Sequence, residues 1–436
     1  MDYLYIDEKG PQETIRMTEP YEDEKKIKLG NDNMFVYVAD VVKISEENLP
    51  IIEENYQLLE NNYKSTRNFE NEKELKGSSI LKNNFKYGVA SLKKRELKFY
   101  SSLMDILLEN DISNLLFTIN KMSLVADNRL TPWILELEKE DYIESARLIK
   151  YSLVKYLEIE ASEKVIQTIF DSSKSNKQVI TEIQKDLYDF IDKHRHNKRM
   201  KVQLLEYKKL RKLIKSKKYL IADYNYKEVS FDWSKVVFNI DLWFTELNYE
   251  NKFAIESAEI LLDEGIPLEP FNKFDSLMIK ENQDSSNHVG LRISDVLVVF
   301  VGKYISNLAS DVRYNKDRPD IRKILSELWF EINEEQFNLI KKIRKFFFPH
   351  NSKYCYIVDT YFDDALLWQT FINYVDSYST FDSYMENTNK HADYHFGYLS
   401  ELMHYKWYES LQEEVQIKNI YGSMKNAIES GVVRSI

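Results

Sequence analysis

The first 44 residues constrain the fold most strongly, because they contain three segments with the two-residue period of β-strands. The segments are YLYID at residues 3–7, ETIRM at 13–17 and MFVYVADVVKI at 34–44, and polar loops separate them. Such loops favour antiparallel pairing of consecutive strands. We therefore expect the chain to begin with an antiparallel meander.

The remaining chain mixes helical and extended patterns. In chain order we expect helices at 45–64 and 92–110, a buried strand at 114–122, helices throughout 132–218, a strand at 233–244, a helix at 254–265, an extended piece at 274–280, a helix at 290–307 and helices beyond residue 317. Strands that alternate with helices in this way predict an α/β fold with a mixed sheet. The two long helical stretches predict a helical insertion and a helical C-terminal unit.

These patterns divide the chain into four parts. We expect the first part of a sheet-containing core at 1–131, a helical insertion at 132–222, the second part of the core at 223–312 and a helical C-terminal domain at 313–436. A chain of 436 residues is long enough for several such units.

Composition excludes several classes of protein. A net charge of −11 argues against a purely electrostatic nucleic-acid binder, although a local basic patch stays compatible with it. The single cysteine, Cys355, excludes an intramolecular disulfide and fits a reducing compartment. The longest apolar run, VLVVFV at 296–301, is too short to span a membrane. We therefore expect a cytoplasmic protein without a membrane partner. Gly-rich phosphate loops, nucleophile elbows and dinucleotide fingerprints are absent from the sequence.

Four carboxylates occur where predicted sheet elements end or helices begin: Asp7, Glu74, Asp241 and Asp295. Asp295 lies within an otherwise apolar helical segment, and Asp241 follows VVFNI and precedes LWF. An unpaired carboxylate in such surroundings is costly to bury, so each needs a cation, a hydrogen-bond donor or exposure to a cleft.

Three motifs make the chain resemble a known family. YIDEKG at 5–10, ELKGS at 74–78 and GLRISDVL at 290–297 follow the order of the YIDESG, ELK and GLQLADL motifs of domain-of-unknown-function family 3800. That family is a branch of the ribonuclease-H-like superfamily. The resemblance covers about residues 1–130 and 225–310. It implies a ribonuclease-H-like mixed sheet, with an antiparallel meander joined to parallel strands.

The resemblance also implies an acidic cluster that binds Mg²⁺ or Mn²⁺. Asp7 would bridge the metals, Glu74 and Asp295 would be further ligands, and Asp241 would complete the set. Lys76 would contact the scissile phosphate or neutralise a carboxylate. Two ions about 3.5–4 Å apart suit phosphodiester cleavage, since they activate a water and stabilise the leaving oxygen. Hard oxygen ligands suit both metals.

The implied function is a divalent-metal-dependent nuclease that hydrolyses phosphodiester bonds of DNA or RNA. Relatives often accompany phage defence, so an antiviral effector is the biological expectation. The chain also departs from the family pattern at Lys9, Arg292 and Ser294, and Asn120 stands where relatives often have an aspartate. The alternative is therefore a catalytically degenerate sensor or assembly subunit that acts through protein contacts. A phosphohydrolase acting on nucleotides is a third hypothesis.

Residues 193–218 form a strongly basic segment, with twelve Lys and Arg against the single acid Glu206. An apolar stripe at helical spacing comprises Leu204, Leu205, Leu210, Leu213 and Ile214. A helix that docks by this stripe would project its charge toward phosphate backbones. The alternative is a solvated helix that pairs with acidic surface. The candidate nucleic-acid-binding residues are Arg199, Lys201, Lys208, Lys209, Arg211, Lys212 and Lys215.

Other features of the sequence predict structure more than chemistry. HADYH at 391–395 places His391 and His395 on one face of a helix, but Ala392 stands where a metalloprotease needs glutamate. We interpret these histidines as packed or exposed, and Cys355 as structural. The aromatic residues of the helical units would serve a protein partner or a homo-oligomer.

Overall fold

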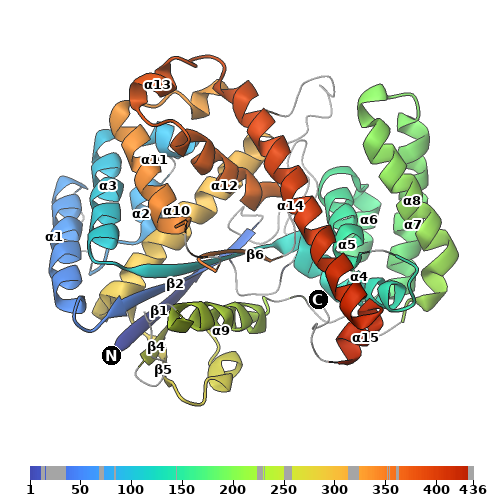
Figure 1. Cartoon of the computed structure of the whole chain (residues 1–436), viewed down its shortest axis with the longest axis horizontal. Coiled ribbons are helices and arrows are strands. Elements are labelled where there is room, and N and C mark those ends of the chain that lie inside the picture. Colours follow the sequence, from blue (N-terminus) through green and yellow to red (C-terminus); the bar gives the residue numbers. More distant parts are fainter. Residues whose placement is uncertain are drawn as a thin grey trace.

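The computed structural model describes residues 1–10, 15, 36–67, 73–82, 85–143, 145–222, 229, 231–249, 258–312, 324–350, 352, 354–359 and 363–430. Its centre is a mixed sheet of six strands in the order β5-β4-β1-β2-β3-β6 (Figure 1). The strands are β1 (Asp2–Lys9), β2 (Val36–Ser45), β3 (Ser113–Asn120), β4 (Ala258–Asp263), β5 (Met278–Gln283) and β6 (Tyr356–Asp359).

Strand directions bring most strand ends to one edge of the sheet. β2 pairs antiparallel with both β1 and β3. β4 is parallel to β1, β5 is parallel to β4 and β6 is parallel to β3. The carboxyl ends of the five strands other than β2 therefore share an edge. That edge faces the helical insertion, because β3 ends at Asn120 and continues directly into the first insertion helix.

Two hydrophobic cores lie on opposite faces of the sheet. Alternation along β1 directs Tyr5 to one core, and Leu4 and Ile6 to the other. The core that contains Tyr5 is covered by α1 (Leu49–Arg67), α2 (Gly77–Leu81), α3 (Lys94–Glu109), α10 (Val289–Asp311), α11 (Glu334–Phe347) and α12 (Asp363–Asp376). Asp7 follows Tyr5 by two residues, so its side chain lies on the same face, beneath α10.

The opposite face packs against α9 (Trp233–Tyr249) and the start of α4 (Lys121–Lys139). From α4 the helical insertion extends away from the sheet (Figure 1). It comprises α5 (Ala146–Lys155), α6 (Glu163–Phe170), α7 (Asn176–His194) and α8 (Lys201–Lys217). The prediction of helices throughout 132–218 is confirmed, and so are the strands β1, β2 and β3 and the helices α1, α3 and α10. The strand predicted at 13–17 lies outside the described residues, apart from Ile15.

Two neighbouring predictions were exchanged. Residues 233–244, predicted as a strand, lie in α9, and residues 258–263, predicted within a helix, form β4. The buried residues of α9 are Trp233, Val236, Val237, Ile240, Trp243, Phe244 and Leu247, which is helical spacing despite the β-branched and aromatic content. β4 is buried on both faces between two parallel partners, so its apolar run lacks the alternation of a half-exposed strand.

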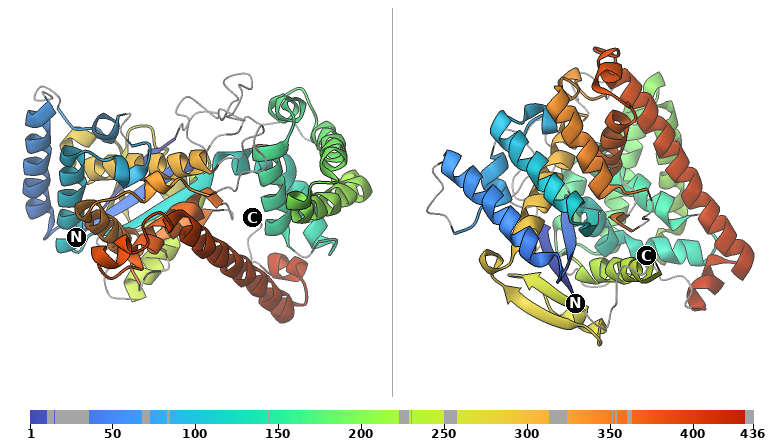
Figure 2. Two further views of the ribbon diagram at one scale, coloured as in Figure 1. Left: turned by 90° about the horizontal axis from the view of Figure 1, so that it is seen from above. Right: turned by 60° about the vertical axis from the view of Figure 1, so that its left-hand side comes forward.

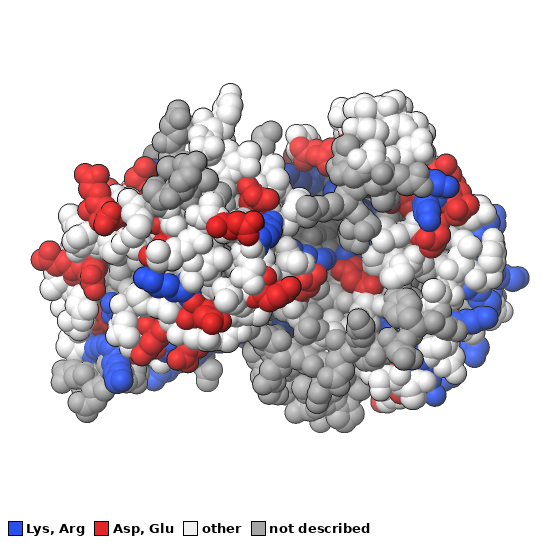
Figure 3. Space-filling model, turned by 90° about the horizontal axis from the view of Figure 1, so that it is seen from below, with Lys and Arg blue, Asp and Glu red and all other residues white. Residues whose placement is uncertain are grey.

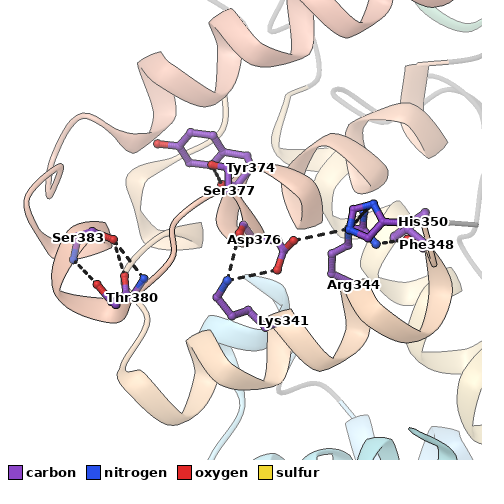
Figure 4. Close-up of polar contacts among 9 residues, drawn as sticks. All are labelled: Lys341, Arg344, Phe348, His350, Tyr374, Asp376, Ser377, Thr380 and Ser383. Carbon is purple, nitrogen blue, oxygen red and sulfur yellow. Dashed lines mark hydrogen bonds and ion pairs between the residues drawn. The ribbon is translucent and has the colours of Figure 1, made fainter.

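The C-terminal part of the chain is not only helical. β6 adds a strand at the edge of the sheet, and α11 and α12 share the core that contains α10. Ion pairs join these two helices: Asp376 at the end of α12 accepts from Lys341 Nζ at 3.3 Å and lies 3.6 Å from Arg344 Nε (Figure 4).

After the short α13 (Phe381–Met385), the long helix α14 (His391–Tyr421) leads to α15 (Met424–Glu429). Figure 2 shows α14 crossing from the helices on the sheet to the insertion. There, Ser145 Oγ donates to Glu414 at 2.7 Å. The ring of Trp407 also contacts that of Tyr151, with centroids 5.6 Å apart. In the described part of the chain, we find no helix with the length and apolar character needed to cross a membrane.

Candidate functional site

The site is built on the strand edge, where two aspartates end neighbouring parallel strands. Ile6 pairs with Leu262, and Asp7 and Asp263 are the next residues on β1 and β4. Asp7 is only 5% exposed, and its Oδ1 accepts a hydrogen bond from the backbone N–H of Glu8 at 2.6 Å. Two carboxylates thus lie side by side beneath α10.

Helix α10 is brought onto β1 by a glycine. A Cβ atom at Gly290 would overlap the ring of Tyr5, so no larger residue fits at this position. The close approach places the first turns of α10 over the end of β1. Asp295, one and a half turns further along, then lies near Asp7. The YIDEKG and GLRISDVL motifs therefore contact each other through Gly290 and Tyr5.

The ELKGS motif joins the same place through a second glycine. The backbone N–H of Gly77 donates to Asp295 Oδ2 at 2.7 Å. A Cβ atom at Gly77 would lie 3.0 Å from the carbonyl oxygen of Asp295 and from the Cα of Val296, so the start of α2 presses on α10. Three motifs that are far apart in the sequence therefore meet at one point in space.

Glu74 and Lys76 form an ion pair at the rim of this site. Lys76 Nζ lies 2.5 Å from Glu74 Oε1 and donates to Ser285 Oγ at 3.0 Å. Ser285 Oγ in turn donates to Glu74 Oε2 at 2.8 Å. The lysine side chain is 44% exposed, so its ammonium group can still reach a ligand in solvent. Ser285 precedes α10 by four residues and had no signal of its own in the sequence.

The carboxylates at the centre of the site have raised pKa values. Burial, followed by the charges of Glu8, Asp295 and Asp263, raises the pKa of Asp7 well above its ordinary value. Burial also raises the pKa of Asp263 to about 6 and raises the pKa of Asp295, although Lys76 and Lys9 partly oppose the effect on Asp295. A cation bound among these groups would favour their ionised forms.

Asp40 adds a further buried carboxyl group beside Asp7. The two residues are directly opposite each other on β1 and β2, so their side chains lie on the same face. Asp40 accepts from Asn114 Nδ2 at 3.1 Å, and burial raises its pKa to about 7. Asp40 was not among the predicted site residues, because a lone aspartate inside the buried strand VYVADVVKIS carries no local sign of which residue it faces.

The donor set fits a hard divalent cation, but it is not preformed. Carboxylate oxygens are the ligands that Mg²⁺ and Mn²⁺ prefer. Among the residues that the structure describes, no group of three or more His, Cys, Asp or Glu side chains is already arranged to hold a metal ion. Side-chain rotation would have to bring the carboxylates of Asp7, Asp263 and Asp295 onto a shared ion.

Asp241, one of the predicted site residues, lies elsewhere. It is on the outer side of α9, its side chain is 57% exposed, and Lys273 Nζ lies 3.5 Å from its Oδ2. Its charge does not appear among the main influences on the pKa of Asp7, Asp263 or Asp295. The structure brings Asp263 to the strand edge instead. The segment EILLDEG at 259–265, an apolar run that ends in two acids, has the pattern of YLYIDE and could have indicated it.

Asn120 has a structural role. Its side chain accepts from the backbone N–H of Ser123 at 3.0 Å and so caps α4, and its Nδ2 donates to Glu158 at 2.5 Å. On β3 the residue opposite Asp40 is Leu116, and Asn120 is four positions further along. That distance is about 13 Å along a strand. Asn120 therefore lies well away from the level of Asp7.

Most of the basic segment forms α8, and its first residues belong to the end of α7 and a short turn. Helix α8 lies at the far end of the molecule from the N-terminus (Figure 1). Its buried side is made by Leu204, Tyr207, Leu210 and Ile214, whereas Leu205, predicted in the apolar stripe, is 50% exposed. Figure 3 shows Lys and Arg side chains gathered along the edge formed by the insertion.

Most of the predicted nucleic-acid-binding residues of α8 face solvent. Lys201, Lys208, Lys212 and Lys215 are exposed. Two others make contacts within the insertion: Lys209 lies 2.9 Å from Glu206, and the Arg211 guanidinium lies 4.5 Å from the centroid of the Tyr188 ring. The backbone of Arg199 belongs to a short turn before α8, and its side chain lies outside the described part of the structure.

The two histidines of HADYH are buried in an aromatic cluster. His391 and His395 are 2% and 1% exposed, and His391 Nδ1 lies 2.9 Å from the Tyr374 hydroxyl. Burial lowers the pKa of His391 to about 4 and the pKa of His395 to about 3. Both rings are therefore neutral at physiological pH and pack as predicted.

Comparison with known proteins gives no relative: no family model, no curated protein and no solved structure matches the chain.

Proposed function

We propose that this protein is a divalent-metal-dependent nuclease of ribonuclease-H-like fold that hydrolyses phosphodiester bonds of DNA or RNA. The observation that carries the proposal is the contact among YIDEKG, ELKGS and GLRISDVL through Gly290 and Gly77. Gly290 lets α10 approach the ring of Tyr5, two residues before Asp7, and Gly77 lets the start of α2 approach the backbone of α10 at Asp295. The sheet agrees with the proposal, since β1, β2 and β3 are antiparallel and β4 and β5 run parallel to β1.

The carboxylates would hold the metal. Asp7, Asp263 and Asp295 would be ligands, and Glu74 would turn inward from the rim. Bound Mg²⁺ or Mn²⁺ would supply Lewis-acid chemistry: it would lower the pKa of a bound water and stabilise charge on the phosphate oxygens. The raised pKa values of Asp7, Asp263 and Asp295 support this arrangement, because buried carboxylates without a cation are destabilising.

The other residues of the site would bind and orient the substrate. Lys76 is exposed enough to exchange its contact with Glu74 for one with a phosphate oxygen. The exposed lysines of α8 would hold more distant phosphates of a long nucleic acid, without reading its sequence. The sheet edge faces the insertion, so a long strand could contact both.

The degenerate alternative loses its main argument. It rested on Asn120 as a lost ligand, but Asn120 caps α4 and is four residues beyond the position level with Asp7. A protein-binding role retains one observation: Tyr394, Tyr405 and Tyr408 on α14 are 48%, 60% and 61% exposed. Exposed tyrosines are typical of protein interfaces.

Metal titration followed by thermal unfolding tests the proposal. Mn²⁺ should raise the melting temperature of the wild type, because a ligand that binds only the folded state stabilises it. Asp7→Asn and Asp295→Asn should abolish that rise. Asp241→Asn is the matched control, since it removes a predicted but exposed carboxylate, and it should leave the rise unchanged.

Cleavage is measured on labelled single- and double-stranded DNA and RNA with Mn²⁺. Activity in the wild type and in Asp241→Asn, but not in Asp7→Asn, is the expected result. A wild type that neither binds Mn²⁺ nor cleaves any of the four substrates would refute the proposal.

A further inference from the structure

A fully buried carboxylate behind the site connects two of its motifs. Glu60, on α1, has no exposed surface. Its Oε1 accepts from the backbone N–H of Leu75 at 2.6 Å, and its Oε2 lies 2.5 Å from Arg292 Nη1. Leu75 lies between Glu74 and Lys76, and Arg292 precedes Asp295 by three residues on α10. One carboxylate therefore contacts both the ELKGS and the GLRISDVL segments.

A second cation completes this network. Lys64, one turn after Glu60 on α1, lies 2.8 Å from Glu60 Oε1 and donates to the carbonyl of Lys73 at 3.1 Å. Lys64 and Arg292 are each 6% exposed. The network thus holds the backbone on both sides of Glu74: Lys64 binds the carbonyl before it, and Glu60 binds the amide after it.

Burying these charged side chains costs free energy, because each of them loses its contacts with water. A buried ion pair is often no more stabilising than well-packed apolar residues, although removing one partner is strongly destabilising. Its specific effect is geometric, since each charge-assisted hydrogen bond fixes a distance and a direction. Here those directions set the backbone of residues 73–75 relative to α10. The same relation decides whether Glu74 and Lys76 face Asp295.

We infer that Glu60 and Arg292 are positioning residues that hold Glu74, Lys76 and Asp295 together as one site. The inference rests on the proposed function for its metal readout, but not for its geometry. It also gives Arg292 a role where the family motif usually has glutamine: its guanidinium joins α10 to Glu60, whereas the other cation, Lys64, is on the same helix as Glu60. Neither residue would touch substrate or metal.

Three variants and a matched control test the inference. The variants are Glu60→Gln, Arg292→Gln and the double variant, which replaces the ion pair with two neutral amides. The control is Asp127→Asn, which breaks an ion pair in the insertion, where Lys150 is 2% exposed and lies 2.5 Å from Asp127. Both kinds of change remove a charge from a buried pair, but only the first is behind the site.

The first measurement is hydrogen–deuterium exchange, which needs no metal. Glu60→Gln should speed exchange at least tenfold in residues 73–81 and in the first turns of α10, and Asp127→Asn should not. The double variant should restore part of the protection, because the two amides can still bond each other and the Leu75 amide, whereas Lys64 loses the carboxylate of Glu60 in both variants. Unchanged exchange in Glu60→Gln, or equal changes in Asp127→Asn, would overturn the inference.

The second measurement is the Mn²⁺ concentration that gives half of the thermal shift. Groups that orient metal ligands typically change metal affinity 10- to 100-fold when mutated. Glu60→Gln should therefore raise this concentration at least tenfold, and Asp127→Asn should leave it within a factor of two of the wild type. An unaltered midpoint in Glu60→Gln would contradict the inference. If the wild type shows no shift at all, the proposed function fails, and hydrogen exchange alone decides the role of Glu60.

Discussion

Two largely buried aspartates, Asp127 and Asp7, have pKa values shifted in opposite directions. In the insertion, Asp127 lies 2.5 Å from Lys150 and 3.3 Å from Lys235, and it accepts from Thr131 at 2.7 Å. Burial opposes ionisation, but these partners hold the pKa of Asp127 below its ordinary value. At the sheet edge, Asp7 is surrounded by other acids, and its pKa is raised.

The difference separates a carboxylate whose charge has nearby cations from one whose neighbours are mainly other acids. Burial is common to both, so burial alone indicates nothing about function. The number of nearby cations makes the difference: Lys150 of α5 and Lys235 of α9 both pair with Asp127, whereas several carboxylates at the strand edge lie around Lys76 and Lys9. Four sets of substitutions test this contrast.

The largest effect is expected at Asp127. Asp127→Ala would leave the buried ammonium of Lys150 without its carboxylate, which should lower the free energy of unfolding by about 3 kcal/mol. Urea denaturation at pH 7 measures the change. A decrease of less than about 1 kcal/mol would mean that the pair is solvated, and the contrast with Asp7 would weaken.

Removing the charge of Asp7 should raise the free energy of unfolding, whereas removing that of Asp127 should lower it. The folded pKa of Asp7 lies above its unfolded value, so the folded state is favoured at low pH and loses stability as pH rises through the folded pKa. Asp7→Asn cannot ionise, so without metal at pH 8 it should be more stable than the wild type.

This gain should disappear at about pH 3, where the wild-type carboxyl is protonated in the folded state and largely so in the unfolded state. Urea denaturation in the presence of a chelator, at both pH values, measures it. Asp241→Asn serves as the control and should change stability by less than about 0.5 kcal/mol. A destabilised Asp7→Asn at pH 8 would show that Asp7 already has a partner that stabilises its charge.

The buried histidines provide a third kind of buried titratable group, one that is neutral at physiological pH. The folded pKa of His395, about 3, is below the ordinary value of 6.5, so stability is full above pH 6.5 and declines as the unfolded state takes up a proton below it. The ring lies against Phe330 and Phe371, with centroids 5.7 Å and 6.0 Å away.

His395→Phe should therefore reduce the loss of stability between pH 6.5 and pH 5 by about 1 kcal/mol. Thermal unfolding at the two pH values measures this difference, with His404→Phe as the control on an exposed part of α14. Equal decreases in the wild type and His395→Phe would show that another group governs the acid response.

The smallest effect on stability is expected on α8. Replacing the exposed Lys208, Lys212 and Lys215 by glutamine should change the free energy of unfolding by less than about 0.5 kcal/mol. If these lysines bind phosphates, the slope of log affinity against log salt should fall by up to about 0.9 for each duplex DNA phosphate that the variant no longer neutralises. An unchanged slope would assign this surface to solvent or to a protein partner.

The spacing of apolar residues along the chain was enough to predict much of the sheet and the helices that cover it. β1 and β2 begin the chain with a two-residue period, and α3 and α10 follow helical spacing. Patterning failed where burial was complete, since β4 lacks alternation and α9 is rich in the residues that strands prefer. Because of this exchange, Asp241 was predicted as a site residue, although the strand at that edge of the sheet ends with Asp263.

Asp7, Glu74, Lys76 and Asp295 could be chosen as site residues before the fold was known, because the three motifs depend only on residue type and spacing along the chain. The tertiary structure alone decided that Asp263 and Asp40 lie beside Asp7, that Asp241 faces solvent, and that Glu60 connects two of the motifs. The physical reason is that the cost of a buried charge depends on neighbours from remote parts of the chain, and only the packed sheet and α10 bring those neighbours together.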